Sequence, residues 1–330
     1  MEPAALARFG FLTLPSYSMI ACANAIEPLR MANRLKGETV YQWRLVTLDG
    51  APATASNGLM LQPTIPLGAE DLDIVFVCGG VHVRSATTPQ LASALRGLAA
   101  RGISLGALCT GAFALAEAGL LQARRCAVHW ENIAAIREEF PDVDFVDDLY
   151  AIDGDRLTCT GGIAPLDMMT RLIGGRLGPE LAQRLSAQFI VEREREGGEA
   201  QPGAISLRLL KAHPRLEAAV RLIERDAGRT TAAEIATRVG LSARQLERLF
   251  VRHIGQTPSG FARRRRLERA KALLEQTALS VTEVAIACGF PSPAHFATTY
   301  RRAFGVSPSA QRLASGPSLA DRPPAASAQG

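Results

Sequence analysis

The spacing of apolar residues along the sequence differs between the two parts of this chain. In the first part, short continuous apolar runs at Arg8–Leu14, Asp73–Cys78 and Ile103–Leu108 predict buried strands. Helical patterns at Met19–Leu35 and Pro89–Ala100 lie between these runs. Because strands that alternate with helices form a mainly parallel sheet covered on both faces, we predict a doubly wound α/β fold. Ligands of such folds bind beyond the carboxyl ends of the strands.

The second part, after about residue 207, shows helical periodicity and capping residues but no convincing strand, which predicts an all-α domain. The stretch 193–206 between the two parts is polar and contains Gly and Pro, so it is the best linker candidate. We therefore predict an α/β domain at residues 1–195, a linker at 196–212, a helical domain at 213–313 and a disordered tail at 314–330.

The helical part contains an internal repeat. One copy begins at Glu234-Ile235-Ala236 and the other at Glu283-Val284-Ala285, with an offset of 49 residues before the turn and 50 after it. Each copy predicts a short helix, a turn entered by glycine (Gly240 or Gly289) and a longer helix that begins at an N-capping serine. This is a helix-turn-helix, present twice. The alternative is a plain helical bundle, but the register agrees over some twenty-five positions.

The charge changes sign between the two parts. The 330 residues carry a net charge of +5, but residues 1–206 hold 17 Lys and Arg against 23 Asp and Glu, a net charge of −6. Residues 207–316 hold 19 against 8, a net charge of +11, and include the run Arg263–Arg266. Only the second part is therefore expected to bind a polyanion.

Several protein classes are disfavoured by the composition. The N-terminus lacks the basic and apolar regions of a secretory signal, and no stretch approaches the roughly 18–20 apolar residues of a membrane span. The six cysteines are scattered without a CxxC pair, which argues against a cysteine-ligated zinc site and a disulfide scaffold. We expect a cytoplasmic protein with reduced thiols, no membrane contact, no bound metal and no cofactor.

The helical part resembles the DNA-binding domain of the AraC/XylS family over about residues 213–313. Residues Ala285–Pro308 closely follow the family signature A-x-x-x-G-F-x-S-x-x-x-F-x-R-x-F-[KR]-x-x-x-G-x-[ST]-P, with Thr298 where many members have Arg. The resemblance implies that two recognition helices, here Ser242–His253 and Ser292–Phe304, enter successive major grooves of double-stranded DNA.

The motif positions assign candidate contacts on both recognition helices. The side chains expected near base edges are Ala243, Arg244, Glu247 and Arg248 in the first helix and Pro293, Ala294, His295 and Thr298 in the second. Arg244 and Arg248 are the strongest candidates because a guanidinium can bind guanine through two hydrogen bonds. Arg301 and Arg302 are assigned to phosphates, so the first unit is expected to read most of the sequence. Ile235, Leu246, Phe250, Phe296 and Phe304 are assigned to the core.

A cysteine lies between an apolar strand and an apolar helix in the α/β part. Cys109 has Ala107 two residues before it and Gly111 two residues after it, as in the sharp elbow that exposes a hydrolase nucleophile. The helix N-terminus beneath is expected to lower the pKa of the thiol. Over about residues 8–190 the sequence resembles the class I glutamine amidotransferase/PfpI superfamily, with further matches at Val75–Gly80 and Ala25–Leu29.

Catalysis by Cys109 is not expected. The resemblance implies that an enzyme of this superfamily needs a His to activate the thiol, often at the next position, where this chain has Thr110. His129 is some twenty residues away, and a nearby Glu27 would raise the pKa of the thiol. We therefore predict no catalytic residue and interpret Cys109 as a thiol that lines a ligand pocket. The alternative is a cysteine-dependent hydrolase or hydratase fused to a DNA-binding domain.

The fusion of these two domains resembles the GlxA-like regulators. That resemblance implies a sensor of a small nitrogenous metabolite, such as arginine, carnitine or glycine betaine. The candidate pocket residues are Tyr17, Glu27, Cys109, Thr110, His129 and Trp130, with core packing as the alternative for the two aromatic residues. We expect a homodimeric activator that works with RNA polymerase; a sequence-independent DNA organiser is a third possibility.

Overall fold

The chain divides into two compact units, Met1–Gln201 and Pro202–Gly330. The computed structural model describes residues 6–191, 195–199, 201, 213–225, 230–277 and 279–315. The predicted linker beyond residue 201 and the predicted tail beyond residue 315 lie outside these described residues. None of the described helices is both long and apolar enough to cross a membrane.

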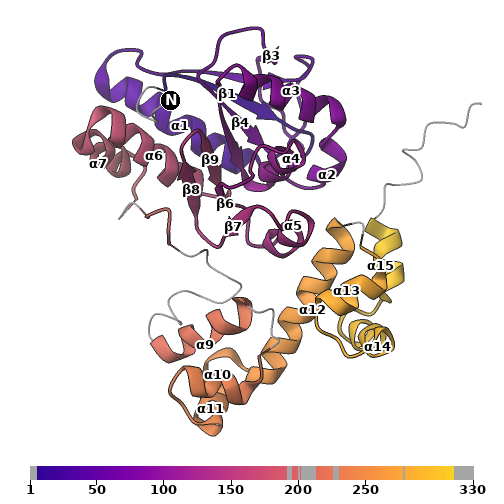
Figure 1. Ribbon diagram of the computed structural model, residues 1–330. Coiled ribbons are helices and arrows are strands. Elements are labelled where there is room, and N and C mark those ends of the chain that lie inside the picture. The colour runs from indigo at the N-terminus through magenta and orange to yellow at the C-terminus, as the bar shows by residue number, and fades with distance from the viewer. Residues whose placement is uncertain are drawn as a thin grey trace, which may run out of the picture. The chain divides into compact units, whose positions relative to one another are not determined.

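A seven-stranded sheet forms the centre of the first unit (Figure 1), as the alternating pattern predicts. In chain order its strands are β1 (Arg8–Thr13), β2 (Gln42–Thr47), β3 (Thr64–Pro66), β4 (Ile74–Cys78), β5 (Ser104–Leu108), β8 (Tyr150–Asp153) and β9 (Arg156–Cys159). Their spatial order is β3-β2-β1-β4-β5-β9-β8, and all pairs are parallel except the β8–β9 hairpin. Strands β6 (Arg125–Ala127) and β7 (Asp144–Val146) form a separate parallel pair.

Helices cover both faces of this sheet. One apolar layer contains Phe9 and Phe11 of β1 and packs against α1 (Met19–Lys36), α6 (Ala164–Leu177) and α7 (Pro179–Gln188). The opposite layer contains Leu12 of β1 and packs against α2 (Val83–Ala86), α3 (Pro89–Ala100), α4 (Ala112–Glu117) and α5 (Ile133–Glu139). Successive side chains of a strand point to opposite faces, so one strand serves both layers. The predicted doubly wound α/β fold is confirmed.

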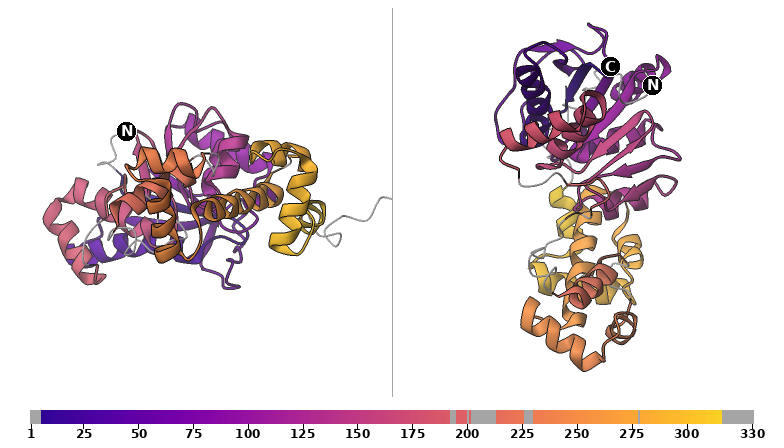
Figure 2. Two further views of the ribbon diagram at one scale, coloured as in Figure 1. Left: turned by 90° about the horizontal axis from the view of Figure 1, so that it is seen from below. Right: turned by 90° about the vertical axis from the view of Figure 1, so that its left-hand side faces the viewer.

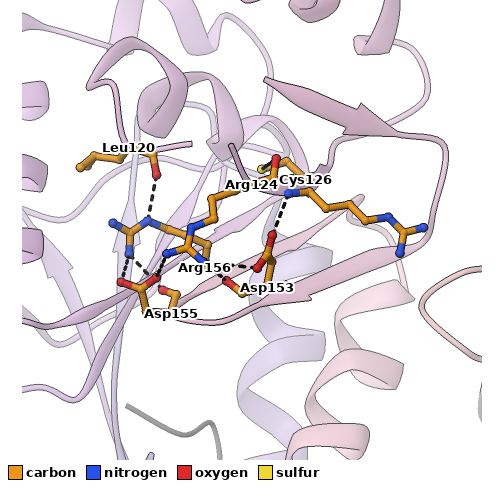
Figure 3. A network of polar contacts seen from close by, with 7 residues as sticks. Leu120, Arg124, Cys126, Asp153, Asp155 and Arg156 are labelled. Atoms are coloured by element: carbon orange, nitrogen blue, oxygen red, sulfur yellow. Dashed lines mark hydrogen bonds and ion pairs between the residues drawn. The ribbon is translucent and has the colours of Figure 1, made fainter. Parts of the chain in front are cut away.

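A polar network holds the β8–β9 hairpin at the end of the sheet opposite to Cys109 (Figure 3). Arg156, at the start of β9, donates to the Leu120 carbonyl at 2.9 Å and to Asp155 at 2.7 Å. Arg124 donates to Asp155 at 3.0 Å, and the backbone N–H of Arg125 donates to Asp153 at 3.0 Å. These bonds tie the hairpin to the segment that enters β6, at the end of the sheet away from the carboxyl end of β5.

Helices are the only regular elements among the described residues of the second unit, as predicted. Its helices are α9 (Pro214–Arg225), α10 (Ala232–Arg238), α11 (Ala243–Ile254), α12 (Pro258–Gln276), α13 (Val281–Ala287), α14 (Pro293–Phe304) and α15 (Pro308–Ser315). The pairs α10–α11 and α13–α14 are the two helix-turn-helix units, and α12 runs between them (Figure 2).

Local signals in the sequence explain these boundaries. Ser242 and Ser292 cap α11 and α14 by accepting the backbone N–H of the third helical residue. Gly240 and Gly289 enter the two turns with φ of 67° and 69°, a conformation that costs other residues more. The predicted capping serines and turn glycines are therefore confirmed.

Residues predicted as the beginning of the linker belong to the first unit instead. Arg195 pairs with Asp167 at 2.5 Å, and Gln201 donates to the Val128 carbonyl at 2.9 Å. The α/β unit thus extends six residues beyond the predicted boundary at 195, because long-range contacts hold a stretch whose composition is typical of a linker.

Candidate nucleic-acid interface and candidate effector site

Cys109 stands at a sharp elbow beyond the carboxyl end of β5. Its φ of 59° lies in the left-handed region, and a short 3₁₀ turn leads from it into α4. Small residues are needed beside it because the backbone of β4 passes close by. A Cβ on Gly111 would lie 2.0 Å from the Val77 carbonyl oxygen, and one on Gly79 would lie 2.4 Å from the Gly111 nitrogen. The predicted elbow is present.

Burial dominates the titration of the thiol at this elbow. The pKa of Cys109 is raised to about 11, mainly by burial; the Thr110 backbone opposes this increase, and the Glu131 carboxylate contributes to it. The predicted decrease of this pKa is therefore wrong, because removal from water outweighs the short helix that follows. A cysteine nucleophile is activated by a neighbouring base, and among the described residues no hydrogen bond joins the Cys109 thiol to an imidazole.

The raised pKa gives Cys109 a characteristic pH dependence. A thiol with a pKa of about 11 is only about one part in a thousand thiolate at pH 8, and thiolate is the reactive form. We expect the alkylation of Cys109 by iodoacetamide to accelerate about tenfold per pH unit between pH 7 and 10. Mass spectrometry of the Cys109 peptide measures the rate. A rate that is already constant between pH 7 and 8 would reveal an activated thiolate and favour an enzyme.

The loop that carries His129, Trp130 and Glu131 borders the elbow. Nδ1 of His129 lies 3.7 Å from Glu131, and its ring centroid lies 5.6 Å from that of Trp130. Burial lowers the pKa of His129 despite this carboxylate, which favours the neutral imidazole. The influence of Glu131 on the Cys109 thiol places its charge near the elbow. Sequence reasoning missed Glu131, although it follows two predicted pocket residues directly.

A second loop, residues 160–163 between β9 and α6, packs directly on Cys109. A Cβ on Gly161 would lie 3.0 Å from Cβ of Cys109 and 3.3 Å from its sulfur. Asn24 of α1 holds this loop by donating to the Gly162 carbonyl at 3.1 Å. Glu27, one turn further along α1, pairs with Arg30 at 2.7 Å, and the structure gives it no contact with Cys109. Glu131 is the carboxylate that contributes to the raised pKa of the thiol, whereas Glu27 as a pocket residue stays a prediction.

Of the remaining candidate pocket residues, Thr110 and Tyr17 are buried and Trp130 is exposed. Thr110 donates to the Gly80 carbonyl at 2.7 Å and so ties the elbow to the loop after β4. Tyr17 is 0% exposed, and bridges to Ala55 and Gly80 fix its backbone, as in the core-packing alternative. Trp130, by contrast, is 36% exposed. A groove of about 570 Å³ between α6 and α7 contains none of the predicted pocket residues.

The candidate base-reading side chains lie on one exposed part of each recognition helix. All the residues assigned to DNA contact are exposed. They are Ala243, Arg244, Glu247 and Arg248 on α11, and Pro293, Ala294, His295, Thr298, Arg301 and Arg302 on α14. The four arginines form no ion pair with any other described residue. Leu246, Phe250 and Phe296 are buried as predicted. Phe304 is only partly buried; its ring packs 4.6 Å from that of Tyr300.

Thr298 uses its hydroxyl proton within its own helix. Its Oγ1 donates to the Ala294 carbonyl at 3.1 Å, so the side chain offers a methyl group and oxygen lone pairs outwards. A methyl group at this position suits the C5-methyl of thymine better than a phosphate.

The arginine run in α12 is partly structural. Arg265 is 13% exposed and bridges Glu224 of α9 at 2.5 Å and Glu268 at 2.7 Å. The Arg266 guanidinium lies over the Phe290 ring at 5.7 Å. Arg265 therefore joins α12 to α9, and Arg266 packs α12 against the turn between α13 and α14. Among the described residues no cluster of three or more His, Cys, Asp or Glu side chains has the geometry of a metal site.

Comparisons with known proteins cover both units. A family model described as "Helix-turn-helix domain" matches residues 235–314, and the model of the DJ-1/PfpI family matches residues 21–174. The HTH-type transcriptional regulator GbdR of Pseudomonas aeruginosa is 43% identical over 305 residues, covering 92% of this chain and 83% of that protein. The regulator CdhR of the same species is 41% identical and covers 92% and 91%. A solved AraC family transcriptional regulator from Pseudomonas putida has 29% identity and a TM-score of 0.51, covering 56% of this chain and 99% of that one.

Proposed function

This chain belongs to the AraC-type transcriptional regulators that carry a DJ-1/PfpI domain, and from that premise we propose that it is an effector-responsive activator. It binds double-stranded DNA through α11 and α14. A small metabolite binds the α/β unit and prefers one of two arrangements of the protein, which changes how the helical unit engages DNA. The observation that carries this proposal is the combination of a duplicated, serine-capped helix-turn-helix with an elbow whose thiol is protonated.

The effector is a small nitrogenous metabolite, either an amino acid such as arginine or a methylated amine such as carnitine or glycine betaine. A cation of this kind favours an aromatic face and a carboxylate, and Trp130 and Glu131 offer both beside the elbow. Val81 and Ile163, which are 53% and 56% exposed on the loops after β4 and β9, suit N-methyl groups. Genes for the catabolism of such a metabolite are the expected targets.

A thermal-shift measurement on the full chain tests the effector. Arginine, carnitine and glycine betaine are added singly, and the unfolding of the α/β unit is followed. A specific effector at about 100 times its Kd raises the melting temperature by roughly 5–10 °C. Glu131→Gln serves as the matched variant and is expected to reduce the shift. No shift with any of the three compounds would contradict this choice of metabolite.

Arg244 is proposed to read a guanine. Arg244→Ala is expected to relax the preference at one operator position by about 1–3 kcal/mol, because the variant loses a two-bond contact to one base. The measurement compares binding to single-base variants of a DNA sequence that the wild-type protein selects from a random pool. Arg301→Ala is the control and should weaken binding to all variants alike. Equal weakening by Arg244→Ala would make Arg244 a phosphate contact.

The α/β unit is proposed to sense rather than to catalyse. The alternative, a cysteine-dependent hydrolase or hydratase, requires a thiolate that the neighbourhood of Cys109 disfavours. The variant Cys109→Ala distinguishes the sensor from the enzyme. Retained promoter activation supports the sensor, whereas loss of a measured turnover supports the enzyme. A sequence-independent DNA organiser would select no sequence from the random pool.

Two further partners complete the proposal. The protein acts as a homodimer formed through the α/β unit, and it engages RNA polymerase at the promoter. The superfamily resemblance of the α/β unit supports dimerisation. Sedimentation that gives a monomeric mass both with and without DNA would disprove the dimer.

A further inference from the structure

Resting on the proposed function, we propose that residues 195–199 and Gln201 form a strap that couples the elbow at Cys109 to the chain leading into the helical unit. The strap follows α7 in sequence and is part of the first unit. Its Arg195 end is bound to Asp167 of α6, and its Gln201 end is bound to Val128, Asp147 and Asp148.

The first anchor is Arg195. Its backbone N–H donates to Oδ1 of Asp167 at 3.1 Å, and its guanidinium donates to Oδ2 through Nε at 3.0 Å and Nη2 at 2.5 Å. Asp167 is 4% exposed, so this buried carboxylate depends on the strap for its opposite charge. Asp167 lies in the first turn of α6, directly after the loop whose Gly161 packs on Cys109.

The second anchor is Gln201. Its amide nitrogen donates to the carbonyls of Val128 at 2.9 Å and Asp148 at 3.2 Å, and its backbone N–H donates to the Asp147 carbonyl at 3.0 Å. Val128 directly precedes His129, the first residue of the loop that carries Glu131. The two anchors thus hold the helix that follows the Gly161 loop and the residue that precedes the Glu131 loop.

Between the anchors the strap pairs with the segment that enters β8. The backbone N–H of Leu149 donates to the carbonyls of Gly197 and Glu199, both at 3.0 Å. A Cβ on Gly197 would lie 2.8 Å from the Tyr150 ring, so the strap lies flat against this sheet edge. The pairing with Leu149 fixes the distance between Arg195 and Gln201. Movement of the Gly161 loop or of the Glu131 loop therefore strains the whole strap.

Release of the strap changes the reach of the second unit. Release of residues 195–199 and Gln201 from the α/β unit lengthens the free segment between the two units. A molecule that enters at Cys109 and separates the two loops favours the released form. By linkage, release of the strap also changes binding at the elbow.

The test uses N-ethylmaleimide at Cys109 as the probe in the full chain. Cys109 is partly exposed, whereas the other five cysteines are buried, so its adduct forms selectively and pushes against Gly161. We expect trypsin to cleave after Arg195 at least about threefold faster in the labelled protein, because cleavage follows the population of the released strap. Cleavage after Arg44, which pairs with Glu70 elsewhere in the unit, provides the internal control.

Substitutions test the coupling without the label. Gln201→Ala is expected to give the same acceleration and at least about a threefold change in apparent affinity for the selected DNA, whereas Gln183→Ala, an exposed glutamine of α7, gives neither. Cys109→Ser treated with the reagent should behave as the untreated protein. Unchanged cleavage after Arg195 in both the labelled protein and Gln201→Ala would overturn the strap. Failure of the proposed function is recognised separately, by a wild-type protein that selects no DNA sequence.

Discussion

Raising the salt concentration from 50 to 200 mM is expected to lower the affinity of this protein for its operator by about three orders of magnitude or more. Residues 207–316 carry a net charge of +11, and Arg238, Arg252 and Arg263 are exposed in addition to Arg301 and Arg302. Each phosphate that an arginine neutralises releases counterions and adds about 0.9 to the slope of log affinity against log salt. Six such contacts suffice for the expected loss.

Fluorescence anisotropy with the selected DNA at several salt concentrations measures this slope. Arg301→Ala and Arg302→Ala should each reduce it by about one. Arg44→Ala, in the acidic α/β unit, removes an exposed arginine of the same chemistry and should leave the slope unchanged. A nearly flat salt dependence would mean that the basic charge of the helical unit does not serve phosphate binding.

Phe250→Ala is expected to destabilise the first helix-turn-helix by about 3–5 kcal/mol and to abolish operator binding. The Phe250 side chain is 0% exposed and packs among Leu216, Ile235 and Leu246, and its ring centroid lies 5.7 Å from that of Phe261. Loss of the ring leaves a cavity where α9, α10, α11 and α12 meet. Because α11 carries Arg244 and Arg248, a helix that no longer packs also no longer presents them to a groove.

Urea unfolding followed by a probe in each unit measures this effect, since two units need not unfold together. Val251→Ala is the matched control, because Val251 is the next residue of α11 and is 50% exposed; its cost should stay within about 0.5 kcal/mol. The α/β unit should unfold as in the wild-type protein in both variants. Operator binding that survives Phe250→Ala would show that the second helix-turn-helix suffices.

The features predicted well depend on residues close together in the sequence. A capping serine and a turn glycine act within one helical turn, so Ser242 and Gly240 place α11 without knowledge of the rest of the chain. Continuous apolar runs likewise mark β4 and β5, and small residues around Cys109 mark the elbow. Each of these signals reports a local requirement of the backbone.

The features that the sequence did not predict depend on residues far apart. Glu131 and Gly161 reach Cys109 from 22 and 52 positions along the chain, and burial of the thiol raises its pKa where the helix alone suggested a decrease. In the sequence, Arg265 is one of four consecutive arginines and is indistinguishable from its neighbours. In the structure it pairs with Glu224, 41 positions away, and so joins two helices.

By itself, then, the sequence determined that this protein has an acidic α/β unit with a cysteine elbow and a basic unit with two helix-turn-helices. Periodicity, capping and charge carry that information because they act along the chain. Only the tertiary structure decided that burial raises the pKa of the thiol, that the Glu131 carboxylate contributes to this increase, and that the start of the predicted linker is bound to Asp167 and Val128. Desolvation and ion pairing depend on neighbours that folding brings together, and no local pattern of residues specifies those neighbours.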